Sequence, residues 1–242
     1  MNDPYLYDGT KVLRNLLNIQ DQKALDLAEA EISRANMMLL YEKGFSNFTN
    51  DGLKEIHKII FNGIYDWAGN FRIINIRKRE ELLAGKSVWY ANHDDIDRDL
   101  KIGWDKINNI SWNKLNLEEL ARNLSFTFPI LWQAHPFRDG NTRTIVSLMT
   151  FFVEHHGYFI DKELLALSAG YVRNAFVLSS FGEHSEFEHL QNILFDALSD
   201  SPISKQKDFG KASSADKSSK YEKYYTTDYK PTPHEYREDN DE

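Results

Sequence analysis

The chain has 242 residues, of which 41% are hydrophobic and 13% aromatic, and this is enough apolar material for one folded domain with a modest extension. The formal net charge of −8 argues against a protein whose main partner is nucleic acid, because such proteins present broad basic surfaces. The absence of cysteine excludes disulfides, thiolate metal sites and cysteine nucleophiles, and a reducing compartment fits best.

The sequence contains no segment typical of membrane insertion or export. No apolar run approaches the roughly 20 residues that are needed to span a bilayer. The polar start Met1–Pro4 lacks the basic and apolar regions of a secretory signal peptide. We therefore expect a cytoplasmic protein without a membrane or nucleic-acid partner.

Two helices are predicted in the first quarter of the chain. Over residues 22–41 the apolar residues recur at intervals of three and four, which is the spacing of one helical face, and Gly44 is expected to end this helix. A second helix is expected to begin near Thr49 or Asn50, either of which can act as its N-cap, and to end near Gly63.

A short β-branched stretch at residues 71–76 is followed by the charged run 77–81 and then by residues 82–90, a pattern that predicts a small β-hairpin. Helical patterns resume after it. They cover about residues 95–110, 117–132, 141–156, 161–178 and 186–198. The predicted fold class is mainly α with one β-hairpin.

Beyond residue 200 the composition changes to Lys, Ser, Asp, Tyr and Pro, and aliphatic residues almost disappear. Such a segment cannot bury enough apolar surface to fold alone. We therefore predict a folded domain over residues 1–199 and a disordered polar tail over residues 200–242. The tail is expected to be either a solvated extension or, through its tyrosines, a binding segment for a partner.

The segment from His135 to Arg143 lies between two helical patterns and is predicted to be a loop that leads into a helix N-terminus, which is a favourable place for phosphate. Gly140 allows close approach of the backbone, and Asp139 carries the oxygen ligands that Mg²⁺ prefers. Arg143 can form two hydrogen bonds to a phosphate. His135 can accept a proton from an attacking hydroxyl. The loop therefore contains the side chains that phosphoryl-type transfer requires.

This segment resembles the signature of the Fic family, His-Pro-Phe-x-Asp/Glu-Gly-Asn-Gly-Arg. The matching residues are His135, Pro136, Phe137, Asp139, Gly140, Asn141 and Arg143. The segment Ile64–Arg72 is similar to the family's Ile-Tyr-x-Trp-Ala-Gly-x-x-Arg, and Pro4–Leu13 resembles its N-terminal arm. The resemblance covers approximately residues 4–198.

The resemblance implies a compact Fic-type helical bundle and a bacterial protein adenylyltransferase, which moves AMP from ATP, with Mg²⁺, to a hydroxyl of another protein. It implies that His135 is the general base and that Asp139 holds the metal. Asn141 and Arg143 would clamp the phosphates, the backbone from Gly140 to Arg143 would form the anion hole, and Phe137 would anchor the loop.

The resemblance also implies that the hairpin, at about residues 74–90, is a flap that pairs with the target protein and presents its Ser, Thr or Tyr hydroxyl. Lys78 and Arg79 in this flap are candidate nucleotide contacts, although a charged run is equally typical of a solvated hairpin face. The target would belong to the same bacterium, as for a toxin, or to a host cell, as for an injected effector.

Two positions depart from the family pattern. Thr142 replaces a glycine and is expected to offer its hydroxyl and its backbone N–H to phosphate, and Val146 replaces a second arginine. Phosphoryl transfer and a degenerate nucleotide-binding module therefore stay open as alternatives. Val146 also removes the ionic partner that an inhibitory glutamate would use. We therefore expect a chain that is active as isolated or is restrained by a separate antitoxin-like protein, by its concentration or by its tail.

Overall fold

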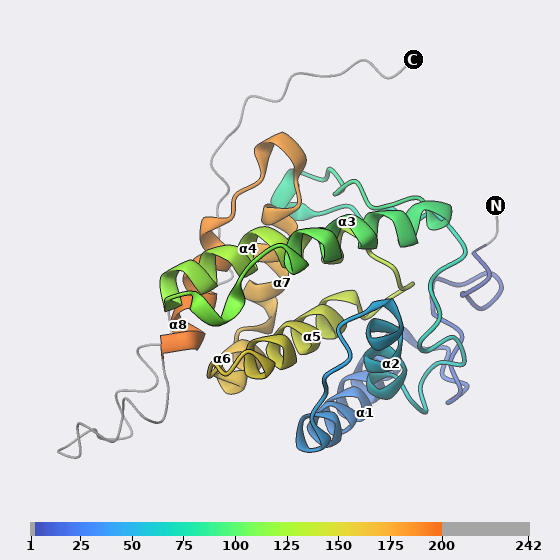
Figure 1. Ribbon diagram of the computed structural model, residues 1–242. Coiled ribbons are helices and arrows are strands. Elements are labelled where there is room, and N and C mark those ends of the chain that lie inside the picture. The colour runs from blue at the N-terminus through green and yellow to red at the C-terminus, as the bar shows by residue number, and fades with distance from the viewer. Residues whose placement is uncertain (1–2, 200–242) are drawn as a thin grey trace, which may run out of the picture.

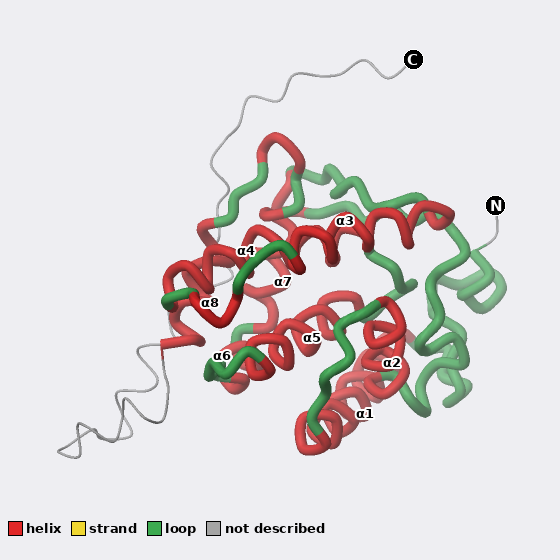
Figure 2. The backbone as a smooth tube through the Cα atoms, in the orientation of Figure 1, coloured by secondary structure: helices red, strands yellow, loops and turns green. Residues whose placement is uncertain are grey.

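The computed structural model describes residues 3–199, which form eight α-helices joined by loops and by four short 3₁₀ turns (Figures 1 and 2). The α-helices are α1 (Gln22–Lys43), α2 (Asn50–Ile60), α3 (Ile96–Asn108), α4 (Leu117–Ala134), α5 (Asn141–His155), α6 (Lys162–Leu167), α7 (Ala169–Ser179) and α8 (Glu188–Ser199). The predicted mainly α fold is confirmed. The predicted tail, residues 200–242, lies outside the described residues.

The start of α2 shows how local sequence sets a helix boundary. Thr49 is the N-cap, and its side chain accepts a hydrogen bond from the Gly52 N–H at 3.2 Å. Asn50, the other candidate cap, instead accepts a hydrogen bond at 2.8 Å from the indole of Trp104 in α3. The cap therefore begins α2, and its neighbour ties α2 to α3.

The single helix predicted over residues 161–178 is in fact two helices, α6 and α7. They meet at Ser168, which ends α6 and precedes α7 with backbone angles of φ −100° and ψ 23°. Both helices contact α8. Ser168 and Gly170 have low helix propensities. The helix therefore breaks where the chain resists a change of direction least, and both halves pack against α8.

The predicted β-hairpin at residues 74–90 is wrong, because the described residues contain no strand. This stretch is a loop with a 3₁₀ turn at Glu81–Leu83. The N–H of Lys78 donates to the Ser87 hydroxyl at 3.3 Å rather than to a carbonyl across a ladder. Leu83 and Val88 are buried, so packing of the loop onto the helices has replaced strand pairing.

Helix α5 lies at the centre of the molecule, between α4 on one side and α2 on the other (Figure 1). Most of its side chains are buried, and each large apolar side chain contributes about 1.5–3 kcal/mol when fully removed from water. Helix α4 also packs against α3 and α8. Because the C-terminus of α4 and the N-terminus of α5 meet, the loop at residues 135–140 is held between two buried helices and next to α2.

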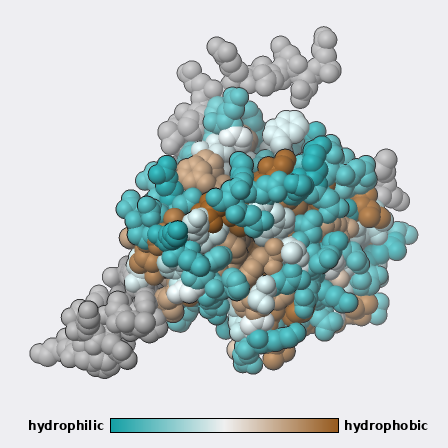
Figure 3. All heavy atoms as spheres, viewed as in Figure 1, coloured by the Kyte–Doolittle hydropathy of each residue, from teal (hydrophilic) through white to brown (hydrophobic). Residues whose placement is uncertain are grey.

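The face of the molecule drawn in Figure 3 is mostly hydrophilic, with hydrophobic side chains in small scattered patches. None of the helices in residues 3–199 has both the length and the apolar composition that crossing a membrane requires.

Candidate active site

The loop between α4 and α5 is bracketed by two residues with left-handed backbones. His135 ends α4 with φ 46° and ψ 57°, and Gly140 precedes α5 with φ 77°. A left-handed conformation costs a residue with a side chain about 1–2 kcal/mol, so the position of His135 must be held by its surroundings.

Arg72 supplies much of that support. Its side chain is buried and its Nε donates to the His135 carbonyl at 2.9 Å, while its backbone N–H donates to the Pro136 carbonyl at 2.8 Å. Further bonds from the guanidinium reach the carbonyls of Ile74 and Ala91. Burial lowers the pKa of Arg72 to about 10, which leaves it charged at neutral pH. Arg72 belongs to a segment that sequence analysis recognised, but its role depends on these contacts.

Two hydrogen bonds between Phe137 and Asn141 stabilise the loop internally. The Phe137 N–H donates to the Asn141 side-chain oxygen at 2.9 Å, and the Asn141 amide nitrogen donates to the Phe137 carbonyl at 2.8 Å. Both residues are buried. The predicted anchoring position of Phe137 is thus present, whereas the Asn141 side chain, expected to bind phosphate, is occupied by the loop backbone.

His57 in α2 is a site residue that sequence reasoning missed. Its ring stacks on Phe137 with centroids 3.8 Å apart, its Nδ1 accepts from the Gly69 N–H at 2.9 Å, and its Nε2 donates to the Asp139 carbonyl at 3.1 Å. Burial lowers its pKa to about 3, which keeps the ring neutral. His57 therefore joins α2 and the turn at Gly69 to the loop. The sequence feature that could have identified His57 is a histidine within an apolar helical pattern.

The His135 ring lies in an aromatic enclosure. Only 3% of the residue is exposed, and the ring stacks on Tyr90 with centroids 4.0 Å apart and meets Trp132 edge-on. Neither ring nitrogen has a hydrogen-bond partner among the described residues. Burial, followed by the charges of Lys78 and Arg72, holds the pKa of His135 well below its usual value. The ring is therefore neutral at pH 7, so one of its nitrogens carries a lone pair.

The Asp139 carboxylate is on the outer side of the same loop, with 40% of its side chain exposed. Its Oδ1 accepts from the Gly140 N–H at 2.6 Å, and Lys78 Nζ lies 3.9 Å away. Burial raises the pKa of this carboxyl, but Lys78, the Gly140 N–H and the nearby arginines together bring the pKa below its usual value. Asp139 is therefore ionised at neutral pH and open to a cation.

The N-terminus of α5 has no side-chain cap, because Gly140 occupies the N-cap position. A Cβ at Gly140 would come within 2.2 Å of the Phe61 ring, so only glycine fits there. The Thr142 hydroxyl accepts a hydrogen bond from the Trp132 indole at 2.9 Å. The backbone N–H groups of the first turn remain available to an anion.

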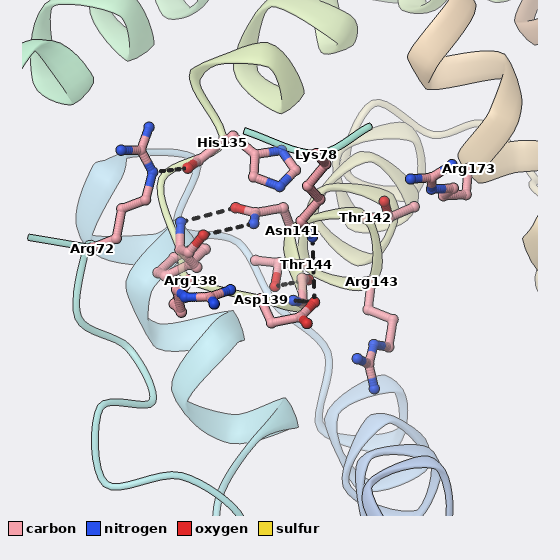
Figure 4. A network of polar contacts seen from close by, with 12 residues as sticks. Arg72, Lys78, His135, Arg138, Asp139, Asn141, Thr142, Arg143, Thr144 and Arg173 are labelled. Atoms are coloured by element: carbon pink, nitrogen blue, oxygen red, sulfur yellow. Dashed lines mark hydrogen bonds and ion pairs between the residues drawn. The ribbon is translucent and has the colours of Figure 1, made fainter. Parts of the chain in front are cut away.

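Arg143 is turned away from His135 toward α1 (Figure 4). Its guanidinium donates to the Ser33 hydroxyl at 2.9 Å and to the Glu29 carboxylate at 2.5 Å, and it lies over the Phe61 ring. The expected contact of Arg143 with phosphate therefore needs a different side-chain orientation.

The two flap candidates are placed differently. Lys78 Nζ lies 3.9 Å from the Asp139 carboxylate and its charge acts on His135, whereas the Arg79 side chain is exposed. Within residues 3–199, no cluster of three or more His, Asp or Glu side chains could hold a metal ion by itself. A metal here would depend on Asp139 and on ligands from a phosphate group, which is a common arrangement for Mg²⁺.

Comparison with known proteins places this loop in a family context. Residues 47–153 match the model of the Fic/DOC family. The chain is 30% identical over 161 residues to protein adenylyltransferase VbhT of Bartonella schoenbuchensis, an alignment that covers 66% of this chain and 32% of VbhT. It thus spans about a third of the length of that relative.

A second relative, the probable protein adenylyltransferase y4lH of Sinorhizobium fredii, is 29% identical over 168 residues, with 68% of this chain and 82% of the relative covered. The solved structure of BepC from Bartonella tribocorum, a VirB-translocated effector with bound AMPPNP, superimposes with a TM-score of 0.67 at 22% identity and covers 80% of this chain and 95% of that one. The chain therefore carries a Fic/DOC family domain, matched over residues 47–153, and its described residues have the Fic fold.

Proposed function

We propose that this chain is a protein adenylyltransferase that transfers AMP from ATP to a Ser, Thr or Tyr hydroxyl of a target protein. One observation carries the proposal: a buried neutral imidazole, His135, and an ionised carboxylate, Asp139, share a loop that ends at an uncapped helix N-terminus. The names of VbhT and y4lH support this activity, and the AMPPNP bound to BepC supports an adenine nucleotide as the second substrate.

In the proposed reaction, a nitrogen of His135 takes the proton of the target hydroxyl. The hydroxyl oxygen forms a bond to the α-phosphorus of ATP, and the bond from that phosphorus to the bridging oxygen breaks, so that pyrophosphate leaves with the electron pair. The enclosed ring has a low pKa because it is buried, so exposing it to solvent and substrate raises its basicity toward that of an ordinary histidine.

The phosphates would lie at the N-terminus of α5, where the N–H groups of Asn141, Thr142 and Arg143 carry the positive end of the helix dipole. Asp139 would hold Mg²⁺, which would neutralise charge on the phosphates when bound. Lys78, which lies beside Asp139, would add a second positive charge. Gly140 lets the backbone approach, and Phe137 keeps the loop in place.

We assign Asn141 and Arg143 to holding the loop and the first turn of α5, because their side chains bind Phe137 and α1 respectively. The protein would act in the bacterial cytoplasm or, like the translocated effectors that share its fold, in a host cell. Its activity would be free or restrained by a separate antitoxin-like protein.

The test uses ATP labelled at the α-phosphate and, separately, at the γ-phosphate, with Mg²⁺ and with bacterial and animal cell lysates. We expect protein-bound label only from α-labelled ATP, and its loss in His135→Ala and Asp139→Ala. His155→Ala is the control, since His155 is an exposed histidine at the end of α5. Label from γ-labelled ATP would indicate a phosphotransferase, and no label from either would indicate a degenerate module.

A further inference from the structure

The stretch from residue 75 to residue 90, called here the covering segment, closes the site over His135. Tyr90 at its end stacks on the His135 ring, of which both nitrogens are buried. A general base must come within about 2.6–3.2 Å of the proton donor, directly or through one water. A target hydroxyl therefore reaches His135 only after the covering segment moves.

The two ends of the covering segment are fixed by hydrogen bonds from Arg72. Arg72 bonds the carbonyls of Ile74 and Ala91, which flank the segment on both sides, and Arg72 is itself 2% exposed. These two bonds fix both ends of the segment to the loop that carries His135. Movement is therefore confined to the residues between these two bonds, which include Tyr90.

The middle of the segment is a closed turn attached to α7 by one ion pair. The Glu80 N–H donates to the Lys86 carbonyl at 2.9 Å, and the Gly85 N–H donates to the Glu80 carbonyl at 2.9 Å. The Glu80 carboxylate accepts from the Arg173 guanidinium at 2.7 Å. The carboxylate is 4% exposed, whereas the Arg173 side chain is 38% exposed.

This difference in burial makes the pair asymmetric. If Arg173 leaves, its guanidinium can be solvated, but Glu80 would stay behind as a buried charge without its partner. Such a stranded charge strongly destabilises the arrangement that buries it. While Glu80 carries its charge, the closed turn is therefore stable only with Arg173 bound to it.

The Arg173 side chain is directed toward the N-terminus of α5, the place proposed for phosphate (Figure 4). One helical turn further along α7, Phe176 stacks on Trp132, with centroids 5.9 Å apart, and Trp132 donates to Thr142 in the first turn of α5. Figure 4 shows the Arg173 guanidinium directed toward Thr142. An anion at the N-terminus of α5 and the Glu80 carboxylate can therefore compete for the same guanidinium, which prefers phosphate oxygens in a two-bond geometry.

We propose that the Glu80–Arg173 ion pair is a latch, which keeps the covering segment closed over His135 and opens when a nucleotide phosphate takes Arg173. The trigger rests on the proposed function, because it requires a nucleotide at the N-terminus of α5. The latch couples uncovering of His135 to arrival of the nucleotide, so the imidazole is exposed to a target hydroxyl only when the second substrate is present.

Hydrogen exchange measured by mass spectrometry tests the latch through the amides of Glu80, Leu83, Ala84, Gly85 and Lys86, which are all hydrogen-bonded within the turn. We expect Arg173→Gln to speed their exchange by at least about tenfold, because it strands the Glu80 charge. The exchange rate should change less than about threefold in Glu80→Gln and in the double variant Glu80→Gln/Arg173→Gln, since neither leaves a buried carboxylate without its partner. Arg173→Lys keeps the charge and should stay closed.

Glu81→Gln is the matched control, because Glu81 is the exposed neighbour of Glu80 and should have no effect. Exchange in α3 reports whether a variant is folded. In the wild type, a non-hydrolysable ATP analogue with Mg²⁺ should increase exchange in the turn, and in Glu80→Gln it should not.

Three results would overturn the latch. The first is unchanged exchange of the turn amides in Arg173→Gln, and the second is that Arg173→Gln speeds this exchange equally when Glu80 is already replaced by Gln. The third is nucleotide binding, measured by calorimetry, without faster exchange of the turn amides. Absence of any nucleotide binding would instead overturn the proposed function together with the trigger, so the two failures are distinguishable.

Discussion

Replacing Asn141 by alanine separates two roles that the same residue could have. The sequence resemblance assigns its side chain to phosphate, whereas the structure shows its amide bonded at both ends to the backbone of Phe137. Asn141→Ala therefore leaves the Phe137 N–H and carbonyl without partners in a site where Phe137 is fully buried. A buried unsatisfied backbone group costs about 1–3 kcal/mol, so we expect the variant to lose about 2–4 kcal/mol of unfolding free energy.

The assay is urea denaturation without nucleotide, in wild type and variant. Asn123→Ala is the matched control, because the Asn123 amide donates to the Glu119 carbonyl on the outer side of α4 and its loss should cost less than about 1 kcal/mol. The reasoning would be refuted if Asn141→Ala were as stable as the control while its affinity for a nucleotide fell tenfold or more. That result would return Asn141 to the phosphate.

The remaining predictions concern the backbone of the loop and its buried histidine. Gly140→Ala and Gly63→Ala both introduce a side chain at nearly the same positive φ, 77° and 79°, and each should lose about 1–2 kcal/mol in urea denaturation. Only Gly140→Ala also meets the Phe61 ring, which should add about 1–3 kcal/mol, and equal losses would contradict this contact. For His57, whose pKa falls from 6.5 when unfolded to about 3 when folded, the unfolded chain binds more protons between these values. Stability should therefore fall as the pH drops below about 6.5, with His57 contributing up to about 1.4 kcal/mol per pH unit and the buried His135 adding to the slope. His57→Gln should reduce the dependence of the urea midpoint on pH in this range.

Local sequence was sufficient for most helices and for the identity of the loop. The three- and four-residue spacing of apolar side chains predicted α1 and α4 close to their observed bounds, because burial of one helix face is encoded in that spacing. The cap of α2 was narrowed to Thr49 or Asn50, because a cap bonds within its own first turn. The loop from His135 to Asn141 was recognised because its residues are contiguous.

The predictions that failed concern segments whose conformation depends on distant partners. The β-branched stretch 71–76 fits a strand, but a strand needs a partner for its backbone groups. Here the burial of Leu83 and Val88 and the Glu80 ion pair hold a loop instead. The helix over 161–178 broke at Ser168 because both halves pack against α8.

The sequence by itself determined which residues form the loop, that a helix follows it, and that the loop contains a histidine and a carboxylate. Only the tertiary structure decided where those side chains point. His57 meets Asp139 across a separation of 82 residues, and Arg143 turns to Glu29 and Ser33 in α1. Spacing within a helix specifies the face that is buried, but the group opposite each side chain is set by how helices distant in the sequence dock against one another.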